Sequence, residues 1–160
     1  LQLSSLDMLQ LEFICFETLD EETVFNMNTL FRRFCGIRTI SCKMCLSYSA
    51  DMAKIDWPHL THLNMRYIGN MAMLIDVLPM IPDLVCLTVE MNFTQSGQLQ
   101  ESIDALSTLR TRYPVPIKSN VRILIVHAWR CEKFDEFSFA AQNIKLILPN
   151  LKSFGVFSTS

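Results

Sequence analysis

The sequence predicts an α/β solenoid, in which a curved parallel sheet lines the concave side and helices line the convex side. The main observation is a six-residue phrase, apolar-x-x-apolar-x-apolar, that recurs along the 160 residues. Three copies, which start at Leu60, Leu84 and Leu151, come two residues after a proline. Repetition of one phrase is typical of repeat proteins, whose units stack in one direction. We therefore expect about six irregular repeats.

The copies are spaced so that each unit has room for one strand and one returning helix. The six copies, each given by its three apolar residues, are Leu6/Leu9/Leu11, Ile37/Ile40/Cys42, Leu60/Leu63/Met65, Leu84/Leu87/Val89, Val121/Leu124/Val126 and Leu151/Phe154/Val156. Their first residues lie 31, 23, 24, 37 and 30 positions apart. Alternating apolar residues predict a strand with one buried face. Helical crossovers between the strands require them to run parallel.

The segments between the phrases change to the apolar spacing of helices. Asp20 and Asn70 are residue types that cap helices, and an apolar stripe follows each of them. The predicted helices carry the stripes Val24–Phe34 and Met71–Leu78 and span Gln98–Arg112 and Glu136–Leu148, with a short turn at Ala50–Ile55. The irregular insertion Tyr113–Lys118 contains two prolines and is expected to bulge from the convex edge or rim.

Composition limits the class of protein. Half of the residues are apolar, which is enough to bury the core of one domain spanning residues 1–160. The net charge of −2, from 14 basic and 16 acidic side chains, lacks the cationic excess that phosphate backbones require, so we expect no nucleic-acid partner. No apolar run reaches the roughly 18 residues that span a membrane. We expect a soluble protein of the cytoplasm or nucleus. Because the first phrase begins at Leu6 without a polar cap, we also expect a piece of a longer protein.

The six cysteines are interpreted as reduced thiols. They are Cys15, Cys35, Cys42, Cys45, Cys86 and Cys131. Cys42 and Cys86 fall within predicted strands, where a cysteine packs as a small apolar residue. The spacing Cys42-x-x-Cys45 could hold zinc, but a structural site needs four ligands and no second pair of this kind follows. We therefore expect no disulfide framework and no metal.

Nothing in the sequence predicts catalysis. His127, Cys131 and Asp135 could be cast as base, nucleophile and orienting acid, yet their spacing suits a strand end and a loop equally well. The four glycines form no cluster that would cradle a nucleotide, and no nucleophile elbow is present. We expect neither enzymatic activity nor a cofactor, and no small-molecule substrate.

The candidate site is the concave face of the sheet. Side chains between the buried positions of each phrase point to that face. The residues after the third apolar position are Glu12, Lys43, Arg66, Glu90 and His127, joined at the site by His62, Asn64, Tyr67 and Met91. One interpretation is that the charges pair with each other across neighbouring strands. The other is a partner-binding row, because arginine, methionine and aromatic residues are enriched at interfaces.

The segments Leu60–Met65 and Leu84–Asn92 resemble leucine-rich repeats, including the asparagine, Asn92, that closes the ladder of such repeats. Cys45 and Cys131 occupy the matching position in their units, as in the cysteine-containing subtype of F-box proteins. The irregular lengths and the Pro-x-Leu starts are similar to those of fungal F-box-like proteins. The resemblance covers nearly the whole chain, whereas the F-box segment itself is not among these residues.

This resemblance implies a non-catalytic protein-interaction module whose concave face binds a protein partner. It further implies the substrate-recognition repeats of an F-box-type ubiquitin-ligase adaptor. The alternative is a structural or signalling leucine-rich-repeat scaffold that regulates a neighbouring domain.

Overall fold

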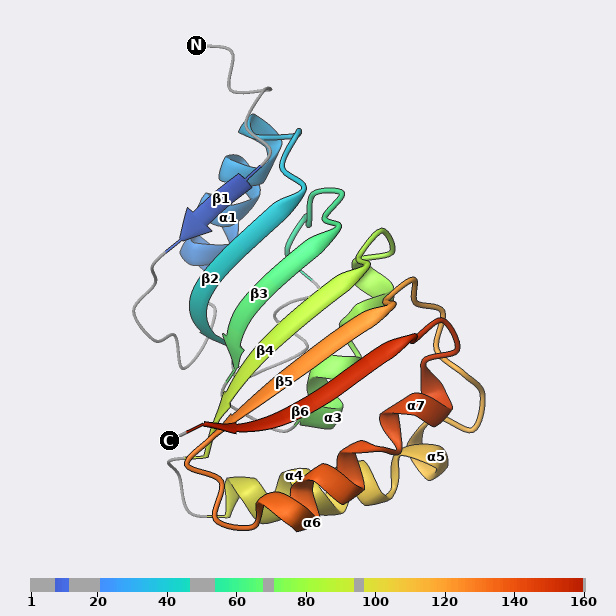
Figure 1. The fold of residues 1–160 in the computed structure, drawn as a ribbon. Helices are drawn as coiled ribbons and strands as arrows, with labels where there is room; N and C mark the ends of the chain where they lie inside the picture. The colour runs from blue at the N-terminus through green and yellow to red at the C-terminus, as the bar shows by residue number, and fades with distance from the viewer. Residues whose placement is uncertain (1–7, 12–20, 47–53, 68–70, 94–96, 160) are drawn as a thin grey trace.

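The computed structural model describes residues 8–11, 21–46, 54–67, 71–93 and 97–159, and these form an α/β structure around one parallel sheet (Figure 1). The strands are β1 (Met8–Leu11), β2 (Thr39–Leu46), β3 (His62–Tyr67), β4 (Cys86–Asn92), β5 (Ile123–Trp129) and β6 (Ser153–Thr159). They lie side by side in chain order, and each neighbouring pair is parallel. The predicted parallel sheet is therefore confirmed within the described residues.

The strands align in the predicted register. Leu63 lies opposite Leu87, which lies opposite Leu124, and the side chains of the three residues are 3%, 2% and 1% exposed. The same row continues outward to Ile40 on one side and to Phe154 on the other. Because side chains alternate along a strand, this alignment places one apolar face of every strand in the same core.

A hydrogen-bond pattern at the strand starts repeats from unit to unit. The carbonyl of Arg38 accepts the N–H groups of Thr61 and His62, at 2.8 and 3.1 Å. The same arrangement recurs between the Thr61 carbonyl and Val85/Cys86, between the Val85 carbonyl and Arg122/Ile123, and between the Arg122 carbonyl and Lys152/Ser153. A carbonyl oxygen has two lone pairs, so each of these groups can accept both donors. The pattern fixes each strand against the preceding one.

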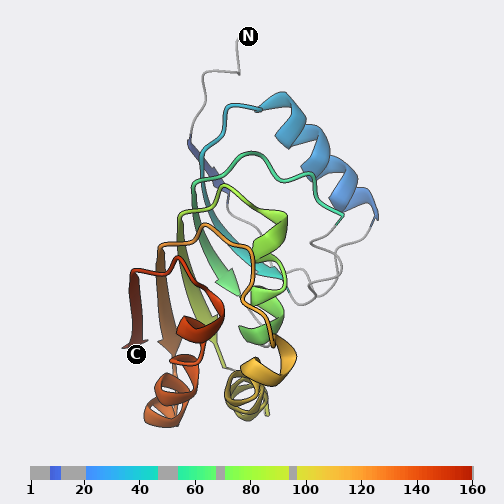
Figure 2. The same ribbon diagram turned by 90° about the vertical axis from the view of Figure 1, so that its right-hand side faces the viewer.

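The helices lie on one side of the sheet, and no described helix lies over the other side (Figure 2). They are α1 (Glu21–Arg33), α3 (Met71–Ile75), α4 (Gln98–Ser107), α5 (Leu109–Arg112), α6 (Phe134–Ala141) and α7 (Ile144–Ile147), with a 3₁₀ turn, η2 (Leu78–Met80), after α3. Phe137, Leu106 and Ile144 are fully buried among them. The core therefore fills the space between the helices and the apolar face of the sheet.

Two helices that the sequence predicts as continuous are each broken. The first ends where the Thr108 side chain donates to the carbonyls of Asp104 and Ala105, at 3.1 and 3.2 Å. Such back-bonding competes with the helical hydrogen bonds. The second breaks before Ile144, next to Asn143, whose side chain donates to the Leu106 carbonyl at 3.1 Å. The first break thus coincides with a local side-chain contact, and the second with a contact between two units.

The insertion at 113–118 is only partly a bulge. Val115 is exposed, as predicted. Ile117 instead is buried, and its N–H group donates to the Ile147 carbonyl at 2.8 Å. The end of the insertion therefore packs into the core between two units, which corrects the expectation that the whole segment stands out at the rim.

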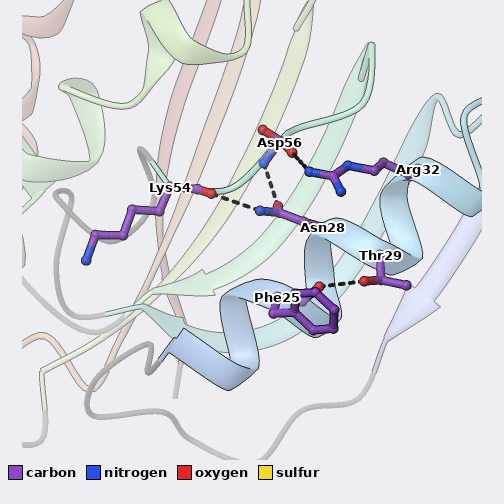
Figure 3. A network of polar contacts seen from close by, with 6 residues as sticks. All are labelled: Phe25, Asn28, Thr29, Arg32, Lys54 and Asp56. Atoms are coloured by element: carbon purple, nitrogen blue, oxygen red, sulfur yellow. Dashed lines mark hydrogen bonds and ion pairs between the residues drawn. The ribbon is translucent and has the colours of Figure 1, made fainter.

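A polar network joins α1 to the segment before β3 (Figure 3). The Asn28 side chain donates to the Lys54 carbonyl at 3.0 Å and accepts from the Asp56 N–H group at 2.7 Å. Arg32 pairs with the Asp56 carboxylate at 2.8 Å. Phe31 also stacks on Trp57 with the ring centres 5.8 Å apart. Of the turn predicted at 50–55, residues 50–53 lie outside the described residues, and the remainder is held by this network.

Replacing Leu87 by Asp should unfold the chain. The substitution removes a buried side chain from the aligned row and leaves a carboxylate without a partner, so it should lower the free energy of unfolding by about 3 kcal/mol or more. Urea denaturation followed by circular dichroism measures this loss. Asn64→Asp is the matched control, because Asn64 is exposed on the neighbouring strand. Equal stability of the two variants would contradict the register.

Candidate functional site on the uncovered face

The sheet face opposite the helices is the candidate site, and we call it the uncovered face. Alternation along β4 explains how it forms: Leu87, Val89 and Met91 are buried, whereas Thr88 and Glu90 between them are partly exposed. The strand pairing brings the corresponding side chains of neighbouring strands into rows across this face.

One row consists of Arg66, Glu90, His127 and Phe157, which are aligned across β3 to β6. An Arg66 Nη atom lies 3.1 Å from a Glu90 carboxylate oxygen, and the two side chains are 38% and 36% exposed. The interpretation that charges of the predicted row pair across neighbouring strands therefore holds for Arg66 and Glu90. Pairs with this exposure contribute only about 0–1 kcal/mol to stability.

The Arg66 guanidinium is not fully satisfied by this pair. Its Nε atom is buried and has no hydrogen-bond partner among the described residues. A buried donor without a partner costs about 1–3 kcal/mol.

An aromatic pair ends the row. The rings of His127 and Phe157 stack with centres 5.7 Å apart and planes 29° apart. Phe157 is 52% exposed, which is high for a large apolar side chain. Ile123, on the same face of β5, is also exposed. The uncovered face is therefore apolar at β5 and β6, whereas His62 and Asn64 make it polar at β3.

Gly155 allows the Phe157 ring to lie on the sheet. A Cβ atom at position 155 would sit 2.6 Å from Cε2 of Phe157, which is closer than two carbon atoms can approach without movement. The residue faces the same side as Phe157, two positions along β6. The glycine therefore leaves the space that the ring occupies beside His127.

The predicted site residues have different outcomes. His62 and Asn64 are exposed, and Arg66, Glu90 and His127 lie together as expected. The prediction for Met91 is wrong: its side chain is 1% exposed, because it lies two residues beyond Val89 and shares the buried face. Glu12 lies outside the described residues. Lys43 and Tyr67 belong to β2 and β3, but their side chains are outside the described part of the structure.

Phe157 is the site residue that the sequence reasoning missed. It is the residue after the third apolar position of the sixth phrase, so it belongs to the same row as Arg66, Glu90 and His127. The predicted row ends at His127, which belongs to the fifth phrase. Extending it by one phrase would have found Phe157, although its exposure depends on the end of the sheet.

The asparagine ladder is not seen within the described residues. Asn92 is the last residue of β4, and its Oδ1 atom is buried without a hydrogen-bond partner there. Asn92 lies opposite Trp129 in the sheet. The next described residue, Phe93, packs its ring edge-on against Phe137 at 5.2 Å. This contact between two aromatic rings lies directly after the end of β4.

Cys131 lies two residues after the end of β5 and is partly buried. Burial raises the pKa of the Cys131 thiol, and a hydrogen bond with the backbone of Lys133 opposes this only in part. A raised pKa reduces the thiolate fraction at neutral pH, and the thiolate is the nucleophilic form. This environment does not favour the nucleophile role considered for Cys131.

The described residues contain no group of three or more His, Cys, Asp or Glu side chains placed to hold a metal ion. None of their helices is long and apolar enough to cross a bilayer. Comparison with known proteins found no matching family model, no matching curated protein and no matching solved structure.

Replacing Gly155 by Ala should move the Phe157 ring off the sheet. The added methyl group occupies the place of the ring edge, so the ring must turn away from His127. The ring-current shift of the His127 imidazole protons in NMR spectra should then decrease. Ser158→Ala, on the same strand, is the control and should leave these protons unchanged. Unaltered His127 shifts in Gly155→Ala would show that the stacking does not depend on the glycine.

Cys131 should react with iodoacetamide more slowly than the exposed Cys35 at neutral pH, because its raised pKa leaves less thiolate. The difference between the two reaction rates should narrow as the pH rises through the pKa of Cys131. Peptide mass spectrometry measures both rates in one sample. Unfolding in urea should make the two rates similar, and equal rates in the folded protein would contradict the effect of burial.

Proposed function

We propose that this chain is a leucine-rich-repeat solenoid that binds a partner protein on the uncovered face. The regular register, the sequential strand order and the placement of the described helices on one side support a stack of similar units. None of the features seen in the described residues requires a catalytic role. We therefore assign the chain a binding role without enzymatic activity.

The observation that carries this proposal is the exposed apolar and charged row at one end of the uncovered face. Phe157 offers a large, half-exposed ring that is held by His127 and Gly155. Arg66 offers a guanidinium group that is 38% exposed and lies beside the Glu90 carboxylate. Aromatic and arginine side chains with little freedom to move are the usual anchors of protein interfaces. The pairing of Arg66 with Glu90 reduces the net charge of the row, which suits a protein better than nucleic acid.

We further propose that the partner is a substrate protein presented to a ubiquitin ligase, in the cytoplasm or nucleus, as the resemblance to F-box-type adaptors implies. The three cysteines whose side chains are described, Cys35, Cys86 and Cys131, are free thiols, which suits a reducing compartment. The scaffold alternative assigns the repeats to regulation of a neighbouring domain. Identifying the protein that the uncovered face binds would distinguish the adaptor from the scaffold.

Capture from the native cell extract tests the site. Phe157→Ala and Arg66→Glu should each reduce recovery of the same partner protein about tenfold or more, because anchors of this kind contribute about 2 kcal/mol to binding. Arg66→Glu should leave the melting temperature nearly unchanged, since an exposed ion pair contributes about 0–1 kcal/mol. Quantitative mass spectrometry of the captured proteins measures the loss.

Phe25→Ala is the matched control, because Phe25 is an exposed phenylalanine on α1, on the helix side of the sheet. It should leave capture intact. If both variants of the uncovered face retain the full set of captured proteins, the binding site lies elsewhere. A captured protein that is ubiquitinated in a Phe157-dependent manner would support the adaptor role over the scaffold.

A further inference from the structure

The charges of this chain are distributed unevenly along its length. Residues 1–104 carry 6 basic and 13 acidic side chains, whereas residues 105–160 carry 8 basic and 3 acidic ones. The three acidic residues of the second part all lie within 132–136, so residues 105–131 and 137–160 contain no carboxylate side chain. The small net charge of the whole chain thus results from one acidic part and one basic part.

Two of the cations in the basic part lie side by side at the starts of β5 and β6 (Figure 1). Arg122 directly precedes β5, and Lys152 directly precedes β6. Because the first residues of the two strands, Ile123 and Ser153, lie opposite each other, the Cα atoms of the two cations are about 5 Å apart. The Arg122 carbonyl also accepts the Lys152 N–H group at 2.8 Å.

A third cation, Lys118, is brought to the same place by hydrogen bonds on either side of it. The N–H group of Ile117 donates to the Ile147 carbonyl, and the Asn150 side chain donates to the Ser119 carbonyl, each at 2.8 Å. The backbone at Lys118 therefore lies beside the turn that leads into β6. We call the group of three cations the basic corner: Lys118, Arg122 and Lys152.

The cations of the basic corner are available to a partner. All three side chains are exposed, and none forms an ion pair with a described carboxylate. Arg122 is exposed although β5 has a strand on each side, so exposure at this position does not depend on the edge of the sheet. Asp83, the acidic residue ahead of β4, pairs instead with His59 at 2.7 Å. Like charges close together attract an anionic group.

The basic corner adjoins the uncovered face. Ile123, which follows Arg122, is exposed on that face, and Ser153 is its exposed neighbour on β6. Phe157 lies four residues along β6 from Ser153, a distance of about 13 Å in an extended strand. Cations, an exposed isoleucine and an exposed phenylalanine thus follow one another along β5 and β6.

We propose that the partner protein carries a short extended segment whose Asp or Glu carboxylates bind the basic corner. Apolar side chains within about five residues of these carboxylates contact Ile123 and Phe157. This inference rests on the proposed function, because it names the chemistry of the partner at the uncovered face. An acidic peptide is favoured over a nucleic acid, since the charged part of the site is confined to three cations and continues as an apolar surface.

Two fluorescent peptides provide the test. The acidic peptide contains four glutamates, then a leucine and, four residues later, a phenylalanine, joined by serine and glycine. In the neutral peptide the glutamates are glutamines. In fluorescence anisotropy the 160-residue chain should bind the acidic peptide about tenfold more tightly, because several exposed charge contacts add together. Raising the salt concentration from about 0.1 to about 1 M should remove most of this preference.

Charge reversal locates the acidic end of the peptide. Arg122→Glu/Lys152→Glu should abolish the preference for the acidic peptide and leave binding of the neutral peptide unchanged. A third peptide, with lysines in place of the glutamates, should bind this double variant more tightly than the original chain. Arg33→Glu/Lys133→Glu is the matched control, because it changes the net charge equally at two exposed positions outside the basic corner. It should keep the preference, and both double variants should keep the melting temperature of the original chain.

Phe157→Ala separates this inference from the proposed function. The variant should weaken both peptides by a similar factor and leave the ratio of their affinities unchanged. If the acidic peptide binds no more tightly than the neutral one while both depend on Phe157, the basic corner is overturned and the uncovered face remains a binding site. If the preference persists and Phe157→Ala affects neither peptide, the proposed function is overturned, and with it the continuous site.

Three further results would overturn the proposal. Absence of saturable binding by the acidic peptide would show that the basic corner does not hold such a segment. Corner-dependent binding of a single-stranded oligonucleotide of equal length, tighter than that of the acidic peptide, would assign the basic corner to a nucleic acid. Dimers in analytical ultracentrifugation that dissociate in Arg122→Glu/Lys152→Glu would assign it to the acidic part of a second copy of the chain.

Discussion

A carbonyl group just ahead of each of β2, β3, β4 and β5 accepts two N–H groups at the start of the next strand, and the register of the sheet depends on this contact. It sets the register at Arg38, Thr61, Val85 and Arg122 in turn. A slip of one residue would move every side chain of a strand to the opposite face. The residues just ahead of the phrases strengthen the same contact: Asn120 donates to the Pro82 carbonyl and Asn150 to the Ser119 carbonyl, each at 2.8 Å.

The register decides burial and exposure together, because strand side chains alternate. Leu63, Leu87 and Leu124 meet in the core, and the residues three positions later, Arg66, Glu90 and His127, meet on the uncovered face. The structural core and the candidate site are thus consequences of one alignment. Their chemistry differs because the first row packs against helices and the second does not. The uncovered face presents side chains, among them Phe157 over Gly155 and the ion pair of Arg66 with Glu90, so its specificity depends on residue identity.

Periodicity in the sequence determined the strands, their parallel order and their register, because these depend on apolar spacing within each phrase. It also predicted that Arg66 and Glu90 are neighbours, which the 3.1 Å pair confirms. The helix break before Ile144 could not be predicted, since the Asn143 contact to Leu106 joins residues 37 positions apart.

The end of the sheet was likewise decided by tertiary structure. Met91 continues the alternation of its strand and is buried, whereas Phe157 is exposed because β6 is an edge and Gly155 leaves room for the ring. Ile117 is buried because the insertion returns to the Ile147 carbonyl. Local spacing specifies which face a side chain takes, but the neighbours that cover that face come from distant parts of the chain, and only the assembled fold determines them.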